Sequence, residues 1–184
     1  MRKGFTLTEL LISIAVSFIV ITAIVNFLII GSQSYQRVNR NIDLQRNARL
    51  VSDRLIREVK RAQIIDPLSD SGSLIFSYYI YTVSSGIISS TLSTVRYYVD
   101  SAGILRRQVK QGTLWVGNNP LTENNIKVLL PLFSYLNYSG NSVAPNNAKV
   151  IAVSLKLDVN KDNQADYTLT FSIYLPVTEN YFLR

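Results

Sequence analysis

The fold is decided by the 21-residue stretch LLISIAVSFIVITAIVNFLII, which occupies residues 10–30. A helix of that length rises about 31 Å, which matches the roughly 30 Å hydrocarbon core of a membrane. The polar residues Ser13, Ser17 and Thr22 can return their hydroxyls to the helix backbone, so they do not interrupt the span. Because Arg2 and Lys3 precede the stretch, the positive-inside rule predicts a cytoplasmic N-terminus and an extracytoplasmic remainder.

A cleaved secretory signal peptide is the main alternative for such an N-terminus. That kind of signal has an apolar core of about 7–15 residues followed by a small-residue cleavage site. The apolar run here is longer and no A-x-A-like site follows it, so the sequence favours a retained membrane helix. A signal-anchored surface protein that never polymerises remains an open alternative.

Glu9 is the only charged residue between Phe5 and Tyr35. A carboxylate beside the hydrocarbon core costs roughly 2–4 kcal/mol on insertion scales and is usually kept for a partner. Two interpretations are open from the residues alone. Thr6 stands three residues earlier, as in a capping box at the membrane interface. Alternatively, a positive charge from another chain neutralises Glu9 inside an assembly.

The stretch GFTLTELLISIAV, residues 4–16, resembles the class III leader and N-terminal helix of type IV pilins and type II secretion pseudopilins. In that family a membrane prepilin peptidase cuts after the glycine and methylates the new N-terminal residue. The resemblance therefore implies a leader over residues 1–4, cleavage between Gly4 and Phe5, and N-methylation of Phe5. It also implies that Glu9 is the assembly glutamate, which pairs with the N-terminal amine of a neighbouring subunit.

A second, looser resemblance covers residues 45–59. This stretch is similar to the segment after the membrane helix in PilW-like minor pilins and in the J-type minor pseudopilins of type II secretion. Major pilins commonly carry a proline within the membrane helix, whereas the first proline here is Pro67, which favours a minor component. The implied partners are the prepilin peptidase, other pilin subunits, the inner-membrane assembly platform and the membrane itself.

Residues 32–65 have the pattern of an amphipathic helix that continues from a membrane helix over residues 5–31. Its apolar side chains recur at three- and four-residue spacing along one face. They are Leu44, Ala48, Val51, Leu55, Val59 and Ala62. Basic residues fall on the opposite side: Arg46, Arg49, Arg54, Arg57, Lys60 and Arg61. The helix is expected to end at Asp66, because a residue before proline avoids helical backbone.

The net charge of +7 is concentrated in this second helix. Residues 36–65 hold eight basic and three acidic residues, whereas residues 66–184 hold nine and eight. The basic face is interpreted as solvated, with acidic neighbours in a filament or DNA as alternatives. DNA has the weakest support, because no nucleic-acid module or interleaved aromatic residues accompany the charge.

The chain contains no cysteine and no histidine. This composition excludes disulfides, thiolate nucleophiles, His-based triads and the usual zinc or haem sites. No other nucleophile–base constellation can be assembled from the sequence. We therefore expect a structural or binding protein rather than an enzyme.

From residue 66 onward the sequence predicts an extracytoplasmic β domain that extends to residue 184. Short β-branched and aromatic runs between turn residues predict strands over residues 74–83, 94–99, 104–109, 133–138, 150–157 and 167–175. In the fifth run one face is wholly apolar: Ile151, Val153, Leu155 and Leu157. The apolar stripe of the helix is the natural cover for that face. The predicted fold is α+β, a long N-terminal helix packed on an antiparallel sheet.

Tyrosines are frequent in the first predicted strands. They are Tyr78, Tyr79, Tyr81, Tyr97 and Tyr98. We interpret them as strand pairs and core edges, with a binding platform as the alternative.

The loop DVNKDNQAD, residues 158–166, is a candidate calcium site. Oxygen ligands at loop positions 1, 3, 5 and 9 fit a hard cation. The four side chains are Asp158, Asn160, Asp162 and Asp166. Against this, Asn163 replaces the usual turn glycine, and Leu169 stands where an EF-hand has its glutamate. The alternatives are a polar hairpin connection and a weak calcium site, the latter implied also by the resemblance, since some pseudopilins bind calcium. A calcium- or DNA-binding adhesin or uptake module is the corresponding alternative function.

Overall fold

The computed structural model describes residues 6–85 and 87–176. The chain divides into two compact units, residues 1–43 and residues 44–184. The predicted continuation of the membrane helix into the amphipathic helix is confirmed: both are parts of one helix, α1 (Leu7–Val59), which contributes to both units. Each unit is described by itself below.

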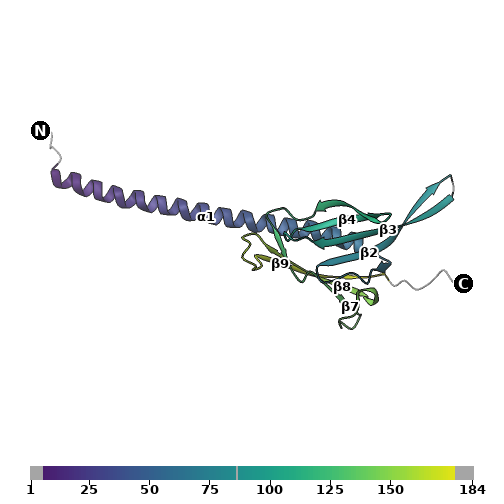
Figure 1. The fold of residues 1–184 in the computed structure, drawn as a ribbon. Coiled ribbons are helices and arrows are strands. Elements are labelled where there is room, and N and C mark those ends of the chain that lie inside the picture. The colour runs from purple at the N-terminus through teal and green to yellow at the C-terminus, as the bar shows by residue number, and fades with distance from the viewer. Residues whose placement is uncertain (1–5, 86, 177–184) are drawn as a thin grey trace. The chain divides into compact units, whose positions relative to one another are not determined.

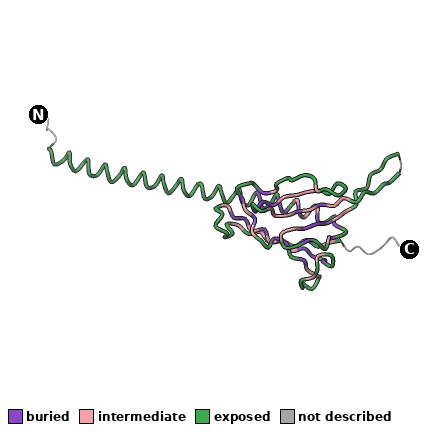
Figure 2. Tube along the Cα trace, viewed as in Figure 1, coloured by how far each residue is buried: buried purple, intermediate pink, exposed green. Residues whose placement is uncertain are grey.

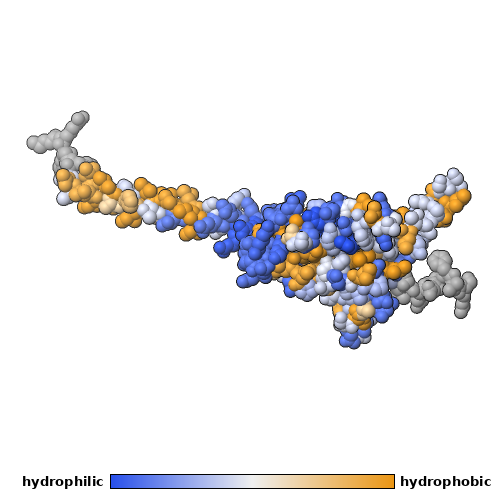
Figure 3. Space-filling model, viewed as in Figure 1, coloured by the Kyte–Doolittle hydropathy of each residue, from blue (hydrophilic) through white to orange (hydrophobic). Residues whose placement is uncertain are grey.

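The first unit is helical from Leu7 onward, and all its described residues are exposed (Figure 2). In the described part of the chain, α1 is the one helix that is long and apolar enough to cross a membrane. As predicted, Ser13, Ser17 and Thr22 donate their hydroxyls to the carbonyl oxygens four residues earlier, at 2.7–2.8 Å. Their polar groups are therefore satisfied within the helix, and the surface stays largely apolar (Figure 3).

The last part of α1 is amphipathic, and the predicted apolar stripe is buried from Leu44 to Val59. Helix α1 ends at Val59, which corrects the predicted end at residue 65. The reason is that Ile64–Ile65 form strand β1, paired with Ser77 and Phe76 of the next strand. Backbone pairing at a sheet edge replaces the last turns that the helical pattern predicted.

Two antiparallel sheets follow (Figure 1). The first has the order β1-β2-β3-β4-β5, with β2 (Ser73–Ser84), β3 (Ile87–Val99), β4 (Leu105–Gln111) and β5 (Leu114–Pro120). In the second, β8 (Val150–Asp158) pairs with β6 (Lys127–Leu129), β7 (Phe133–Leu136) and β9 (Tyr167–Tyr174). A short 3-10 helix, η1 (Pro145–Asn147), precedes β8.

The predicted strands lie within or close to the observed ones, with one large difference. Strand β3 begins at Ile87 rather than at residue 94, so the β2–β3 hairpin is much longer than predicted. Strands β1, β5 and β6 were not predicted at all.

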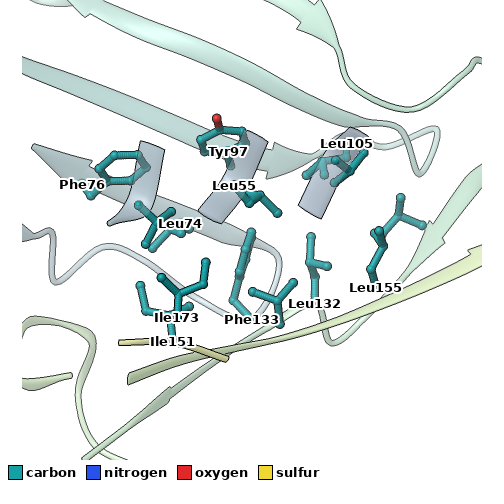
Figure 4. Packing of buried hydrophobic residues seen from close by; sticks show 14 of the residues in the cluster. Leu55, Leu74, Phe76, Tyr97, Leu105, Leu132, Phe133, Ile151, Leu155 and Ile173 are labelled. Carbon is teal, nitrogen blue, oxygen red and sulfur yellow. The ribbon is translucent and has the colours of Figure 1, made fainter. Parts of the chain in front are cut away.

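A single hydrophobic core joins the helix to both sheets within the second unit (Figure 4). Leu55 of α1, Tyr97 of β3 and Ile151 of β8 are each fully buried in it. The apolar face predicted for β8 is confirmed, since all four of its side chains have no exposed surface. Burying each such side chain stabilises the fold by about 1.5–3 kcal/mol. The α+β fold, with the helix packed against antiparallel sheet, is thus confirmed.

Polar side chains also connect the elements of the second unit. The carboxylate of Glu58 on α1 accepts from Nε of Arg107 on β4 at 2.9 Å. The hydroxyl of Tyr135 on β7 donates to the carbonyl oxygens of Asp70 and Ser73 at 3.0 and 2.9 Å. Burial raises the pKa of Tyr135, which keeps this hydroxyl a donor across the physiological range.

Candidate functional site

The N-terminus of α1 is a reciprocal capping box. The backbone N–H and the hydroxyl of Thr6 both donate to Oε2 of Glu9 at 2.9 Å, and the N–H of Glu9 donates to the Thr6 hydroxyl at 3.3 Å. These contacts satisfy two backbone donors that the first helical turn leaves without a partner. The capping arrangement, one of the two interpretations of Glu9, is therefore present.

The surroundings of Glu9 contain no compensating positive charge within the described residues. None of the ion pairs formed there involves Glu9. The first basic residue among them is Arg37, about 42 Å farther along the helix at 1.5 Å per residue. Nearby side chains such as Leu7 and Leu10 are apolar and exposed. The cap therefore satisfies the hydrogen bonds of the carboxylate, while its charge has no cationic partner between Thr6 and Ser85 or in residues 87–176.

The other predicted N-terminal site residues, Gly4 and Phe5, lie outside the described residues. So does the predicted leader, residues 1–4.

The candidate calcium loop is built around Asp158, the last residue of β8. Its side chain is fully buried, and its two oxygens accept from the backbone N–H groups of Lys161 at 2.6 Å and Asn163 at 2.9 Å. Lys161 and Asn163 both have positive φ, 60° and 64°. Asparagine tolerates this left-handed backbone better than most residues, so Asn163 can take the place of the usual turn glycine. Asp158 thus acts as the organising acceptor of the connection between β8 and β9.

The carboxylates of the other candidate ligands also accept hydrogen bonds from backbone N–H groups of the loop. Asp166 accepts from the N–H of Val159 at 2.8 Å, and Asp162 accepts from the N–H of Gln164 at 2.8 Å. Asn160 is exposed. Among the described residues, no three Asp, Glu, His or Cys side chains form a group that could hold a metal ion. This geometry favours the polar-connection alternative, and calcium binding stays a prediction.

Sequence reasoning missed a cation–π stack on the outer face of the five-stranded sheet. The guanidinium carbon of Arg96 lies 4.1 Å from the ring centroid of Tyr98 and 5.4 Å from that of Trp115. The three residues border a cavity of about 790 Å³ whose lining holds as many acidic as basic side chains. Its charged residues are Asp66, Asp70, Arg96 and Lys110. The stack connects β3 to β5 and places Trp115 outside the core.

Comparison with known proteins gives one finding. Residues 1–25 match the model of the prokaryotic N-terminal methylation motif, a span that contains Gly4, Phe5 and Glu9. No curated protein and no solved structure matches the chain. The apolar helix and the motif together are consistent with a signal-anchored membrane protein. The match supports the type IV pilin and pseudopilin family for this chain and indicates a type IV pilin-like substrate of the prepilin peptidase.

Proposed function

We propose that the chain is a structural minor pilin or pseudopilin, of the PilW-like or J-type kind, that assembles into a type IV pilus or a pseudopilus. Cleavage falls between Gly4 and Phe5, and Phe5 is then N-methylated. The observation that carries the proposal is the charge of Glu9 on the exposed first part of α1, where no other residue from Thr6 to Gln36 is charged. Its role is structural rather than enzymatic.

The proposed sequence of events begins in the membrane. The N-terminus faces the cytoplasm and the β domain is extracytoplasmic, as the charges before the helix predict. Lipid surrounds the exposed side chains of the first unit until the inner-membrane assembly platform adds the subunit to a filament. There the same side chains pack against the helices of other subunits.

Glu9 sets the register between subunits in this proposal. The new N-terminal amine of a neighbouring subunit is cationic at neutral pH, since such amines titrate near pH 7.7–8.0. Pairing with it removes the cost of an uncompensated carboxylate in apolar surroundings. The carboxylate exchanges its Thr6 contacts for the amine at that moment, so the cap supports Glu9 only until assembly.

The processing step is tested by intact mass and N-terminal sequencing of the chain made with and without a prepilin peptidase. We expect the loss of Met1–Gly4 and the gain of one methyl group on Phe5 only when the peptidase is present. An uncut Met1 under both conditions would reject processing and leave a signal-anchored surface protein.

The assembly step is tested by separating the charge of Glu9 from its capping role. Glu9→Gln keeps an oxygen that can accept from Thr6 but removes the charge, whereas Thr6→Ala weakens the cap and keeps the charge. If the charge pairs with an amine, Glu9→Gln is processed but absent from filaments, and Thr6→Ala is incorporated. The opposite pattern would show that Glu9 only caps the helix.

A further inference from the structure

The outer part of the β2–β3 hairpin, residues 78–84 and 87–94, extends beyond the rest of the second unit (Figure 1). Strand β1 pairs with β2 only at Phe76 and Ser77, and β4 pairs with β3 only from Val95 onward. Among the described residues, this outer hairpin is therefore a two-stranded ribbon with two open edges. Such a ribbon is at best marginally stable alone in water.

Five of the seven large exposed apolar side chains of the outer hairpin lie on the face directed away from the core, and Ile80 and Ile87 lie on the other face. Phe76 pairs with Val95 and both are buried, so even-numbered positions of β2 face inward and odd-numbered ones face outward. The outward pairs are Tyr79–Leu92, Tyr81–Ser90 and Val83–Ile88. The exposed fractions of their five large side chains run from 41% to 72%.

The inward face at the same level is rich in hydroxyl groups. Thr82 and Ser89 are hydrogen-bonded to each other at 2.7 Å, and Thr91 lies opposite Ile80. A hairpin that packs on a core normally turns its apolar face toward that core and its polar face toward solvent. The outer hairpin has the reverse arrangement. Figure 3 shows apolar side chains at this end of the molecule.

The open edge of β2 presents backbone donors and acceptors in a known register. The carbonyl oxygens of Ile75 and Ser77 accept from Asp66 and Gln63, so odd-numbered residues direct their backbone groups to this edge. By the two-residue period of a strand, Tyr79, Tyr81 and Val83 do the same. Their backbone groups have no strand partner in the described part of the chain.

This edge lacks the protection that natural edge strands carry. Edges are usually guarded by lysine, proline or a bulge. Residues 71–95 contain no charged residue and no proline, in a chain that is 17% charged. The absence of guarding residues on both strands indicates an edge that another strand covers.

The chemistry of the hairpin restricts what can cover it. Lipid would leave the backbone groups of both edges without hydrogen-bond partners, which is costly in hydrocarbon. A charged partner would find no opposite charge between residues 71 and 95. A second copy of this chain fits. The two copies would meet through their uncharged hairpins, so the basic part of each α1, which supplies most of the net charge of +7, stays out of the interface.

We propose that the Tyr79–Val83 edge of β2 pairs antiparallel with the same segment of a second copy, with the two-fold axis at Tyr81. This register opposes Tyr79 to Val83 of the other copy and Tyr81 to itself. Each of these pairs exchanges two backbone hydrogen bonds and brings aromatic and β-branched side chains together on the outer face. The seven large apolar side chains of the outer hairpin are 41–72% exposed in the single chain, so apolar surface is available beside the paired edges.

The register can be tested by disulfide trapping, because the chain has no cysteine. In the Tyr81→Cys variant the two Cα atoms would lie about 5.5 Å apart, within the range that a disulfide spans. Val83→Cys is the matched control, on the same edge and face. Its two Cα atoms would be roughly 13 Å apart, since four residues separate them along the strands. Ser139→Cys, exposed in a distant loop, reports random collision.

The experiment uses the full chain in its native membrane under mild oxidation, with dimers quantified on non-reducing gels. We expect Tyr81→Cys to form at least fivefold more disulfide dimer than either control. Val83→Pro in the Tyr81→Cys background removes one edge N–H and should reduce that dimer to the control level. The proposal is overturned if Tyr81→Cys and Val83→Cys trap equally, if Tyr81→Cys stays at the collision level, or if Val83→Pro changes nothing.

Discussion

Asp100 is the residue that shapes the turn between β3 and β4. Its Oδ1 accepts from the N–H groups of Ala102 and Ile104 at 2.9 Å, and its Oδ2 accepts from Nε of Arg106. Gly103 occupies this turn with φ +82°, and a side chain there would collide with Lys127. One carboxylate therefore satisfies two turn amides and a guanidinium at once.

The same contacts predict an acid-sensitive contribution to stability. Burial by itself would raise the pKa of Asp100, but the hydrogen bonds from Arg106, Ile104 and Ala102 hold that pKa below its usual value. A lowered folded-state pKa stabilises the fold above the unfolded value near 3.9, and this contribution is lost as pH falls through the folded value. We expect Asp100→Asn to lower the free energy of unfolding by about 1–2 kcal/mol at pH 7 and by less at pH 3.

Urea unfolding followed by the emission of Trp115, the sole tryptophan, measures this difference. Asp53→Asn, at an exposed position of α1, is the control and should change stability little at either pH. A loss in Asp100→Asn that is the same at pH 7 and pH 3 would contradict the ionic origin of the effect.

Asp158 allows the two interpretations of the 158–166 loop to be separated. Because its oxygens already accept from Lys161 and Asn163, we expect Asp158→Ala to cost about 2–4 kcal/mol whether or not calcium is present. The measurement is thermal unfolding with and without millimolar calcium, for this variant and the parent chain. Stabilisation of the parent by calcium, lost in Asp158→Ala, would instead establish the calcium site.

At the scale of elements, the ion pair of Glu58 with Arg107 is a polar contact between α1 and β4. Its carboxylate accepts from Arg54 on the same helix and from Arg107 on the sheet, and the side chains of Glu58 and Arg107 are mostly buried. Burial would lower the pKa of Arg107, but the hydrogen bond and charge of Glu58 raise it. Removing the carboxylate leaves a guanidinium without its partner.

We expect Glu58→Ala to lower the free energy of unfolding by about 1–3 kcal/mol, because a partly buried charge then loses its counter-charge. Asp53→Ala is the matched control, since it removes an exposed carboxylate five residues earlier on the same helix. Urea unfolding of both variants provides the comparison. Equal losses in the two would mean that the effect belongs to the helix and not to its contact with the sheet.

Elements were predictable where one face meets the core and the other meets water. The stripe from Leu44 to Val59 and the alternation in β8 both follow from that contrast. The first half of β3 lacks it, because its serines and threonines resemble turn residues and its apolar side chains face solvent. Strand β5 contains Gly117 and Pro120 and is held by its pairing with β4, a contact that local sequence does not encode.

At the scale of the whole molecule, the candidate sites differ in how far sequence alone could define them. Glu9 was recognisable because the motif is local and its charge stands out in an apolar helix. Its partner is absent from the chain's own described residues, so the site is completed only by another molecule in our proposal. The 158–166 spacing suited a cation, yet spacing does not determine whether an oxygen faces an ion or a backbone amide.

The division of the chain at residues 43 and 44 predicts that the second unit folds without the first. Buried positions begin at Leu44, and every described residue before it is exposed, so a chain that starts at Val38 loses no core contact. Tertiary packing, rather than the preceding turns, then holds residues 44–59 helical. We expect this chain to be soluble without detergent and to unfold in urea cooperatively, as reported by Trp115. Leu55→Ala within it should cost about 2–5 kcal/mol through the cavity it creates. A shortened chain that unfolds without a cooperative transition, or that is insensitive to Leu55→Ala, would show that the core depends on the N-terminal helix.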